Sequence, residues 1–209
     1  VQGALLGGLL NNGQVCAAAS RFYVHRSRYD EFVEKLAAAV AGMSLGEGMD
    51  PSAQINPLVS AKQQRSVLEH IARAGEQGAR IVCGGEQIAG NGFYVQPTVL
   101  ADVTMQMAVA RDEVFGPVLA VLPFDDEEQA IEMANDSEYG LGASLWSRDH
   151  AQALRVSARL RAGVVWVNAW GIRDLRTPFG GVKLSGIGRE GGEHSLNFYS
   201  EPTNICVSF

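Results

Sequence analysis

Apolar residues follow two spacings along this chain, one typical of buried strands and one typical of amphipathic helices. Short apolar runs predict strands at 20–25, 79–83, 93–97, 117–122, 141–146 and 163–168. Apolar residues at helical spacing predict a first helix that ends near residue 10, helices that contain residues 29–40, 67–72 and 130–134, and a helix from 149 to about 160. Because strands and helices alternate over short connections, we expect βαβ units and an α/β fold with a doubly wound, mostly parallel sheet.

Polar residues that can accept a hydrogen bond from a backbone N–H mark the predicted starts of these helices. The predicted caps are Ser27, Ser60 with Gln63 as the second member of a capping box, Asp125 or Asp126, and Asp149 with Gln152. The caps divide the chain into the same helices as the periodicity does, so both signals support one α/β architecture.

Composition narrows the class of protein. The 209 residues are 46% hydrophobic and 19% charged, which is typical of a folded domain. The net charge of −6 argues against nucleic acid as a partner, because phosphate binding needs concentrated Lys and Arg. No apolar run reaches the roughly 20 residues that cross a bilayer, and residues 1–10 lack the basic start of a signal peptide. Three widely separated cysteines favour reduced thiols, so we expect a cytoplasmic protein without a membrane partner.

Cys16 is the leading candidate for a nucleophile. It follows the polar stretch Asn11-Asn-Gly-Gln14 and precedes the strand predicted at 20–25. A thiol attacks as the thiolate, so a reactive cysteine needs backbone N–H groups or positive charge that lower its pKa from the usual value of about 8.5. A loop between a helix and a strand can provide both. Position alone leaves open the alternative that Cys16 is a small buried hydrophobic residue.

Two further segments have features of ligand sites. Glu113 and Phe115 lie just before the strand at 117–122, although ligands of α/β sheets usually lie at the carboxyl ends of strands. A solvated Glu beside a core Phe is the alternative. Residues 186–191 match the G-x-G-x-x-G spacing of dinucleotide sites, but no strand precedes them and no βαβ unit fits after them. We therefore interpret them as a turn that needs positive φ angles.

Arg173 and Arg176 flank Asp174 just after a predicted strand. A guanidinium binds a carboxylate through two hydrogen bonds, so either arginine is a candidate for holding a carboxylated substrate. An ordinary surface ion pair with Asp174 is the alternative. The amides of Gln14 and Asn168 could line a pocket or bind loop backbone. The four histidines share no spacing typical of a metal site, and no metal is expected.

Four motifs, in order along the whole chain, resemble those of the aldehyde dehydrogenase superfamily. They are Asn11-x-Gly-Gln-x-Cys16 followed by Ser20-Arg21, Glu113-Val-Phe-Gly-Pro-Val118, Gly163-Val-Val-Trp-Val-Asn168, and Pro178-Phe-Gly-Gly-Val-Lys-Leu-Ser-Gly186. The loop with Arg173 and Arg176 resembles the branch that acts on 2-hydroxymuconate and 2-aminomuconate semialdehydes. The resemblance covers only the C-terminal, catalytic part of the family, less than half of a full-length member.

This resemblance implies a mechanism and a role for each candidate residue. The Cys16 thiolate would attack an aldehyde, the Cys16 N–H would hold part of the oxyanion, hydride would leave to NAD(P)+, and water would hydrolyse the thioester. The implied cofactor is NAD, with NADP as the alternative. Its site would include Glu113 at the nicotinamide ribose, Phe115 near the nicotinamide, and Gln63. The substrate site would include Gln14, Asn168, Arg173, Arg176 and Phe179, with Arg176 favoured as the partner of a substrate carboxylate.

The resemblance also predicts how the chain is divided and how it assembles. Residues 1–185 would form the nucleophile-bearing catalytic domain, and residues 186–209 an arm whose strand at 204–209 pairs with a neighbour in a homo-oligomer. The family's general-base Glu, oxyanion Asn and N-terminal NAD-binding domain have no counterpart in these residues, so we expect the isolated chain to be inactive. A Cys16-dependent acyltransferase or thioesterase, and a truncated module without catalysis, are the alternative functions.

Overall fold

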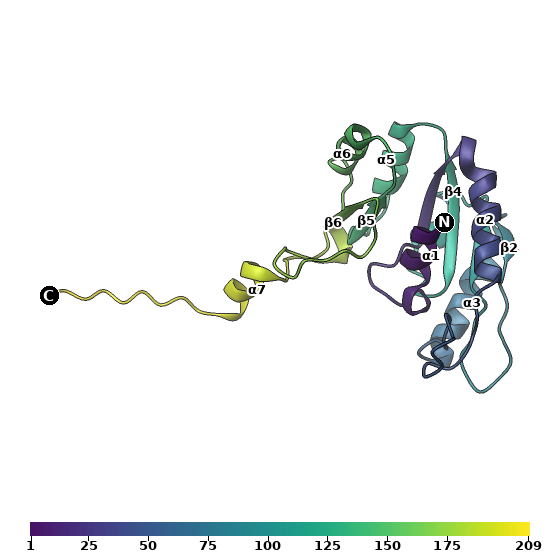
Figure 1. The fold of residues 1–209 in the computed structure, drawn as a ribbon, viewed down its shortest axis with the longest axis horizontal. Helices are drawn as coiled ribbons and strands as arrows, with labels where there is room; N and C mark the ends of the chain where they lie inside the picture. Colours follow the sequence, from purple (N-terminus) through teal and green to yellow (C-terminus); the bar gives the residue numbers. More distant parts are fainter.

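The computed structural model describes residues 1–209, which form two sheets, their covering helices and an extended C-terminal tail (Figure 1). The α-helices are α1 (Gln2–Leu9), α2 (Tyr29–Ala41), α3 (Ala61–Glu76), α4 (Ala108–Arg111), α5 (Glu127–Asn135), α6 (His150–Ser157) and α7 (Gly192–Tyr199). The strands are β1 (Arg21–His25), β2 (Arg80–Cys83), β3 (Thr98–Ala101), β4 (Val118–Phe124), β5 (Gly142–Leu145) and β6 (Val164–Val167). The short 3-10 turns are η1 (Leu10–Gly13), η2 (Arg26–Arg28) and η3 (Lys183–Ser185). These elements confirm the predicted α/β class.

The larger sheet has four strands in the order β1-β4-β3-β2. β4 pairs in parallel with β1 and with β3, whereas β2 joins β3 in the antiparallel sense. Residues 118–122 of β4 are all buried, as expected of a strand that lies inside a sheet and is covered on both faces. β1 lies at one edge of this sheet and pairs only with β4.

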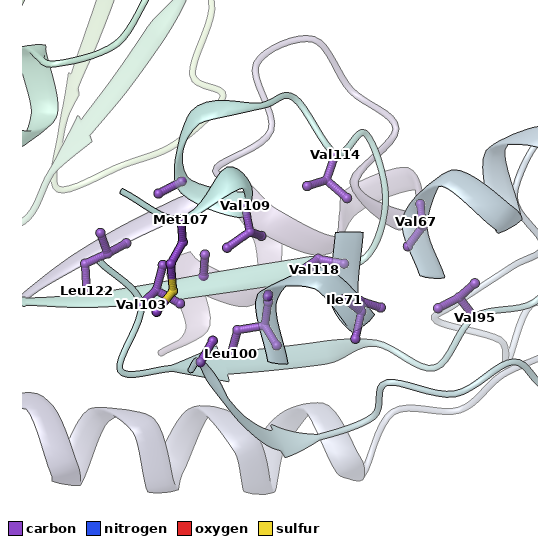
Figure 2. Packing of buried hydrophobic residues seen from close by; sticks show 14 of the residues in the cluster. Val67, Ile71, Val95, Leu100, Val103, Met107, Val109, Val114, Val118 and Leu122 are labelled. Carbon is purple, nitrogen blue, oxygen red and sulfur yellow. The ribbon is translucent and has the colours of Figure 1, made fainter. Parts of the chain in front are cut away.

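Helices cover both faces of the larger sheet, and each face has its own hydrophobic cluster. On one face, Val67 of α3 packs in a cluster with Leu100 and Val118 (Figure 2). On the other face, Leu36 of α2 belongs to a cluster with Leu119. Successive residues of a strand point to opposite faces, so the uninterrupted apolar run of β4 supplies both clusters.

β5 and β6 form a separate, two-stranded parallel sheet, with α6 between them in the chain. The predicted doubly wound parallel arrangement therefore holds for the larger sheet, but the strands do not form one continuous sheet. Salt bridges join the helices on the second sheet: Glu127 and Glu128 of α5 pair with Arg155 and Arg159. Few apolar side chains are buried in this part of the chain; they are Ile131, Ala153, Val156 and Trp166.

Glycines on α1 let the second sheet lie close to the first. Gly3 and Gly7 are four residues apart on one side of the helix, and a Cβ there would meet the rings of Trp146 and Trp170 respectively. A Cβ at Gly8 would overlap the side chain of a leucine in β4. α1 is thus packed on more than one side, which explains why its sequence shows no single apolar face.

Most of the predicted helix caps are confirmed. The cap side chains that accept a backbone N–H are Ser60 from Gln63, Asp126 from Gln129, and Asp149 from Gln152. Of the two aspartates considered for α5, it is therefore Asp126 that caps the helix.

Ser27 is not a helix cap, so that prediction is wrong. Ser27 lies in the 3-10 turn η2, where its N–H donates to Nδ1 of His25 at 3.2 Å. α2 begins at Tyr29 without a side-chain cap. The His25 imidazole, two residues earlier, therefore caps the 3-10 turn η2 that precedes the helix.

The strand predicted at 93–97 is placed too early. Only an isolated bridge between Gln87 and Val95 lies there, and β3 begins one residue after Pro97. Proline has no N–H to donate to a ladder. β3 therefore starts only after Pro97, and all four of its residues are buried between β2 and β4.

The C-terminal residues lie outside both sheets. Gly186, Gly188 and Gly191 have φ angles of 145°, 78° and 96°, which confirms the predicted turn at 186–191. α7 has no buried residue, and residues 200–209 form neither helix nor strand and extend away from the rest of the chain (Figure 1). Pairing of 204–209 with a neighbour stays a prediction about an assembly. None of the helices has both the length and the apolar content that crossing a membrane requires.

Candidate active site

Cys16 lies in the loop between α1 and β1, and its side chain is exposed. Just before it, Asn11, Asn12 and Gly13 have φ angles of 49°, 59° and 70°. Asn and Gly adopt this left-handed region at the lowest cost of all residues. The Asn-Asn-Gly sequence therefore allows the sharp turn that ends α1 and directs the chain to Cys16.

Two amide side chains fix this turn to a distant loop. Asn12 is 2% exposed; its Oδ1 accepts from the N–H of Asn56 at 2.8 Å, and its Nδ2 donates to the Pro57 carbonyl at 3.3 Å. Gln14 adds a third bond, because its Oε1 accepts from the N–H of Val59 at 3.0 Å. The backbone that leads to Cys16 is thus held by hydrogen bonds across more than forty residues of sequence.

The segment that carries Glu113 and Phe115 lies directly against the Cys16 loop. A Cβ added to Gly13 would overlap the carbonyl oxygen of Gly116. Glycine at position 13 is therefore required twice, once for its φ angle and once for this close approach. The first two motifs of the sequence meet at this point.

Gln63 holds the second of these motifs in an unfavourable conformation. Phe115 has a φ angle of 52°, which is uncommon for a bulky residue. Nε2 of Gln63 donates to the carbonyls of Val114 (3.0 Å) and Phe115 (2.8 Å). The Gln63 side chain therefore does not return to Ser60, and the predicted capping box is only half formed.

A cleft of about 840 Å³ opens between the Cys16 loop, the Glu113 segment and the second sheet. Cys16, Glu113 and Phe115 all line it, and Trp146 and Trp170 line its other side. Nε1 of Trp170 donates to the carbonyl of the residue after Cys16 at 2.9 Å, which attaches the second sheet to the Cys16 loop. Cys16 is thus brought together with Glu113 and Phe115, which lie nearly one hundred positions later in the sequence.

The other predicted site residues do not line this cleft. They are Gln14, Gln63, Asn168, Arg173, Arg176 and Phe179. Gln14 and Gln63 bind backbone at its borders, as described above. The roles predicted for these residues stay predictions. To bind a ligand, each side chain would have to exchange its present hydrogen bonds or ion pairs for contacts with that ligand.

Both arginines are paired with acidic neighbours. Arg173 forms an ion pair with Glu190 at 2.6 Å, and its guanidinium lies 4.5 Å from the centre of the Phe179 ring. Arg176 pairs with Asp174 at 2.6 Å and is 89% exposed. The hydrogen bond between Arg176 and Asp174 raises the pKa of the guanidinium and lowers the pKa of the carboxyl group. Arg173 is held in place, whereas Arg176 is free to leave its partner for solvent or a ligand.

Asn168 joins the ends of β5 and β6. Its side-chain oxygen accepts from the N–H of Ser147, and its Nδ2 donates to the Ser147 carbonyl, both at 2.9 Å. This side chain reproduces a backbone pairing just beyond the strands. The amide that sequence reasoning offered for a pocket is thus fully used in binding backbone.

Comparison with known proteins adds the family. The model of the aldehyde dehydrogenase family matches residues 1–205. The chain belongs to this family. The motif resemblance seen in the sequence is thereby confirmed.

Three similar proteins show how far this match extends. The 2-hydroxymuconic semialdehyde dehydrogenase of Pseudomonas sp. strain CF600 is 45% identical, over 99% of this chain and 44% of that protein. A betaine aldehyde dehydrogenase of Cereibacter sphaeroides is 44% identical, over 98% of this chain and 42% of that protein. The solved NAD+ complex of an aldehyde dehydrogenase from Bacillus cereus is 44% identical with a TM-score of 0.93, over 96% of this chain and 41% of that one. The chain spans less than half of the length of each.

Sequence reasoning missed a residue that ties the aldehyde dehydrogenase motif at Glu113 to the far side of the cleft. Arg111 donates to the Met105 carbonyl (2.5 Å), the Asp136 carbonyl (3.0 Å) and the Asp136 carboxylate (2.6 Å). This pairing lowers the pKa of Asp136 and raises that of Arg111. A lone arginine has no distinctive spacing, so nothing in the sequence marked it.

The packing of tryptophans on α1 also escaped sequence reasoning, although a signal was present. Glycines at positions 3 and 7 share one side of a helix, and this spacing admits large rings from another element.

No group of three His, Cys, Asp or Glu side chains is clustered as a metal site would need. The cleft lining includes the thiol of Cys16, the carboxylate of Glu113 and the aromatic rings of Phe115, Trp146 and Trp170.

Proposed function

We propose that this chain supplies the nucleophile-bearing part of an NAD(P)+-dependent aldehyde dehydrogenase. The observation that carries the proposal is the meeting of Cys16, Glu113 and Phe115 around one cleft. Cys16 is exposed and makes no disulfide, so its sulfur is accessible to a small aldehyde. Membership of the family and the motifs that surround Cys16 support the same reaction.

In this proposal, Cys16 works by covalent catalysis. The Sγ thiolate adds to the aldehyde carbonyl carbon, and the carbonyl oxygen becomes an oxyanion that the Cys16 N–H helps to hold. The Asn-Asn-Gly turn leads the chain directly to Cys16, whose N–H and thiol belong to the same residue. Loss of hydride leaves a thioester on Sγ, which water hydrolyses to the carboxylic acid and the free thiol.

The residues around the cleft fit a nicotinamide cofactor. Glu113 is exposed and forms no ion pair, so its carboxylate is free to accept hydrogen bonds from two ribose hydroxyls. Phe115, fixed by Gln63, offers an exposed ring face at the same wall. NAD+ accepts the hydride when bound. The solved relative in complex with NAD+ supports NAD as the cofactor, with NADP as the alternative.

We propose a carboxylated semialdehyde, such as 2-hydroxymuconate semialdehyde, as the substrate. The relative that is 45% identical carries that substrate in its name, but a betaine aldehyde dehydrogenase is almost as similar. Sequence identity therefore does not distinguish these two substrates. The positive charge of the arginines after β6 favours a substrate that carries a carboxylate. Arg176 is the favoured carboxylate partner because it is exposed and would exchange Asp174 for the ligand; Arg173 is the other candidate.

The division and assembly of the chain are part of the same proposal. Residues 1–185 would form the catalytic domain and residues 186–209 an oligomerisation arm that pairs with a second copy. The exposure of Leu196, Phe198, Ile205 and Val207 supports this, because a partner would cover them. Sedimentation of the chain with and without residues 200–209 tests it: a homo-oligomer that becomes a monomer on deletion is expected. Free cysteines agree with the cytoplasmic location that we propose.

The central experiment measures NADH formation. The full chain is assayed with NAD+ and 2-hydroxymuconate semialdehyde, alone and together with the unmatched part of the Pseudomonas sp. CF600 relative as a separate polypeptide. We expect NADH only in the mixture, and a loss of at least about a thousandfold with Cys16→Ser. Cys83→Ser is the matched control and should keep the activity.

Other results would replace the proposal. NADH formation that survives Cys16→Ser would remove Cys16 from the mechanism. Thioester hydrolysis or acyl transfer by Cys16 without NAD+ would favour the thioesterase alternative.

Arg176→Ala should raise KM for the carboxylated semialdehyde about tenfold and leave KM for an uncharged aldehyde unchanged. An equal effect of this substitution on both substrates would contradict the role of Arg176.

A further inference from the structure

The loop that carries Cys16 contains a tight turn, and this turn leaves the backbone N–H of Cys16 free. The N–H of Ala18 donates to the Val15 carbonyl at 2.9 Å, so Cys16 and Ala17 are the two central residues of the turn. The N–H groups of these two residues donate to no group of the chain. The Cys16 N–H is therefore available to a substrate oxyanion, as long as the turn keeps this conformation.

A tryptophan from the second sheet holds the turn closed. Nε1 of Trp170 donates to the Ala17 carbonyl at 2.9 Å. The same peptide unit joins this carbonyl to the N–H of Ala18, which is the N–H that closes the turn. Because a peptide unit is planar and rigid, hydrogen bonds at both of its ends fix its orientation. The orientation of the peptide after Cys16 therefore depends on Trp170.

The bond from Trp170 has no substitute among the other side chains. It is the only side-chain hydrogen bond to residues 15–20. The residues before Cys16 are held differently, because Asn12 and Gln14 bind the backbone of the 56–59 segment. Cys16 thus lies between two anchors, and Trp170 provides the side-chain anchor that follows it.

Trp170 is itself held in place by its surroundings. A Cβ at Gly7 would lie 3.1 Å from Cγ of Trp170, so the ring packs directly on α1 at this glycine. The Gly7 carbonyl accepts from the N–H of Ala19 at 2.8 Å, so the same residue of α1 supports the ring and binds the Cys16 loop.

A second tryptophan supports the first. The ring of Trp166 has its centre 6.1 Å from that of Trp170. Nε1 of Trp166 donates to the Ile172 carbonyl at 2.7 Å, which closes the loop on which Trp170 lies. A donor whose side chain and backbone are both supported in this way is preorganised for its acceptor.

We propose that Trp170 is a positioning residue for the Cys16 nucleophile. Its indole N–H, rather than the size of its ring, keeps the turn at 15–18 in the conformation that leaves the Cys16 N–H unbonded. Trp170 acts through the Ala17 peptide and does not touch the reacting atoms. The inference rests on the proposed function, because it assigns Trp170 to the reaction of Cys16.

Amide exchange, measured residue by residue by NMR on the full chain, tests the positioning without any reaction. Trp170→Phe keeps an aromatic ring beside Gly7 and removes the donor. We expect the amides of Ala18 and Ala19 to exchange about fivefold to tenfold faster in this variant, because the turn then opens without breaking the bond to Ala17.

Trp146→Phe is the matched control for ring packing. Trp146 packs on Gly3 of the same helix, and its indole donates no hydrogen bond. This substitution removes the same part of a ring and should leave the exchange of Ala18 and Ala19 unchanged. Should Trp170→Phe not fold, Gly7→Ala tests the same bond, because the added Cβ displaces the Trp170 ring. Gly7→Ala should accelerate the same two amides.

The first turnover tests whether this positioning matters for the reaction. The full chain is mixed with the unmatched part of the Pseudomonas sp. CF600 relative, NAD+ and 2-hydroxymuconate semialdehyde, and NADH is followed with enzyme in excess. We expect Trp170→Phe to lower the first-order rate constant about tenfold and to keep the amplitude, since a displaced nucleophile slows the attack. A merely structural role would lower the amplitude, which counts folded enzyme, and leave the rate constant unchanged.

Three results would overturn the proposal. One is unchanged exchange of Ala18 and Ala19 in a folded Trp170→Phe variant. Another is equal acceleration by Trp146→Phe, because ring packing would then hold the turn. The third is faster exchange with an unchanged rate constant of the first turnover. Failure of the proposed function would appear separately, as a mixture with the unsubstituted chain that forms no NADH; the exchange of Ala18 and Ala19 would then decide alone whether Trp170 holds the turn.

Discussion

Residues 1–124 and residues 125–209 bury their apolar side chains to very different extents. Both hydrophobic clusters consist entirely of residues from the first region, which surround the larger sheet on two faces. In the second region the buried hydrophobic residues are only Ile131, Ala153, Val156 and Trp166. Surface ion pairs between α5 and α6, and the packing of two tryptophans on α1, replace a core there.

This difference shows which parts of the chain are complete by themselves. The first region contains both hydrophobic clusters, so it has the properties of an independently stable unit. The second region leaves apolar residues of α7 and the tail in solvent. Such surfaces are typical of interfaces. The stability of the two regions should therefore respond differently to substitution, acid and partners.

The largest difference is expected from leucine truncation. Leu119→Ala, at a residue that is 0% exposed, should lower the free energy of unfolding by about 3–5 kcal/mol, because it leaves a cavity between β4 and α2. Leu196→Ala in α7, at a residue that is 66% exposed, should change it by less than about 0.5 kcal/mol. Urea denaturation monitored by circular dichroism measures both. An equal loss for both variants would show that α7 is buried in an assembly.

Gly13→Ala tests the junction between the two motifs. Alanine at a φ angle of 70°, with its Cβ against the Gly116 carbonyl, should cost about 2–3 kcal/mol of unfolding free energy. Gly171→Ala is the matched control, because Gly171 has a similar φ of 77° but nothing within 4 Å of an added Cβ. This control should lose only about 1 kcal/mol. Similar losses would mean that close contact at Gly13 has no effect beyond its φ angle.

Sequence reasoning predicted most of the elements in the first region, and it failed where local signals were overruled. β1, β2 and β4, and the helix capped by Ser60, follow from apolar runs and a cap. The apolar run at 93–97 predicts β3 too early, because the run ends at Pro97, which has no N–H to donate to a ladder. Position alone predicts Ser27 as a cap, because nothing in the sequence reveals that the ring of His25 accepts the Ser27 N–H. The split into two sheets depends on distant pairing, which no local pattern contains.

The candidate site was predicted in part for a related reason. Cys16, Glu113 and Phe115 belong to motifs, and the cleft brings them together. The residues that hold these motifs in place, such as Arg111 and Asn12, act through single hydrogen bonds to backbone and leave no spacing to recognise. Gln63 was placed at the cofactor without knowledge of the carbonyls it binds. Positioning contacts are a property of the folded backbone, so they emerge only with the structure.

Arg111 connects the two regions, so its removal should weaken the second more than the first. Arg111→Met removes hydrogen bonds to the carbonyl and carboxylate of Asp136, and water replaces them in part because Arg111 is partly exposed. We expect a loss of about 1 kcal/mol and faster amide exchange at residues 136–142, with little change in β4. Arg26→Met breaks a more exposed pair with Asp125 and should have a smaller effect on stability than Arg111→Met, because solvent screens the charges of that pair. Uniformly faster exchange in both regions would contradict a linking role for Arg111.

Acid should loosen the second region before the first, because the second region buries fewer apolar residues and its helix α5 is ion-paired with Arg155 and Arg159. Hydrogen bonds from Arg155 and Gln152 lower the pKa of Glu127 from its usual 4.5 to about 2. A lowered carboxyl pKa means that the folded state favours the ionised form. Its stabilisation is complete above about pH 4.5 and is lost as the pH falls through about 2. The difference in Tm between the unsubstituted chain and Glu127→Gln should therefore be constant at neutral pH and disappear towards pH 2. Glu132→Gln is the control, on the same helix but without an ion pair, and its Tm at neutral pH should differ much less from that of the unsubstituted chain. If the difference in Tm for Glu127→Gln did not depend on pH, the ion pair would not be its cause.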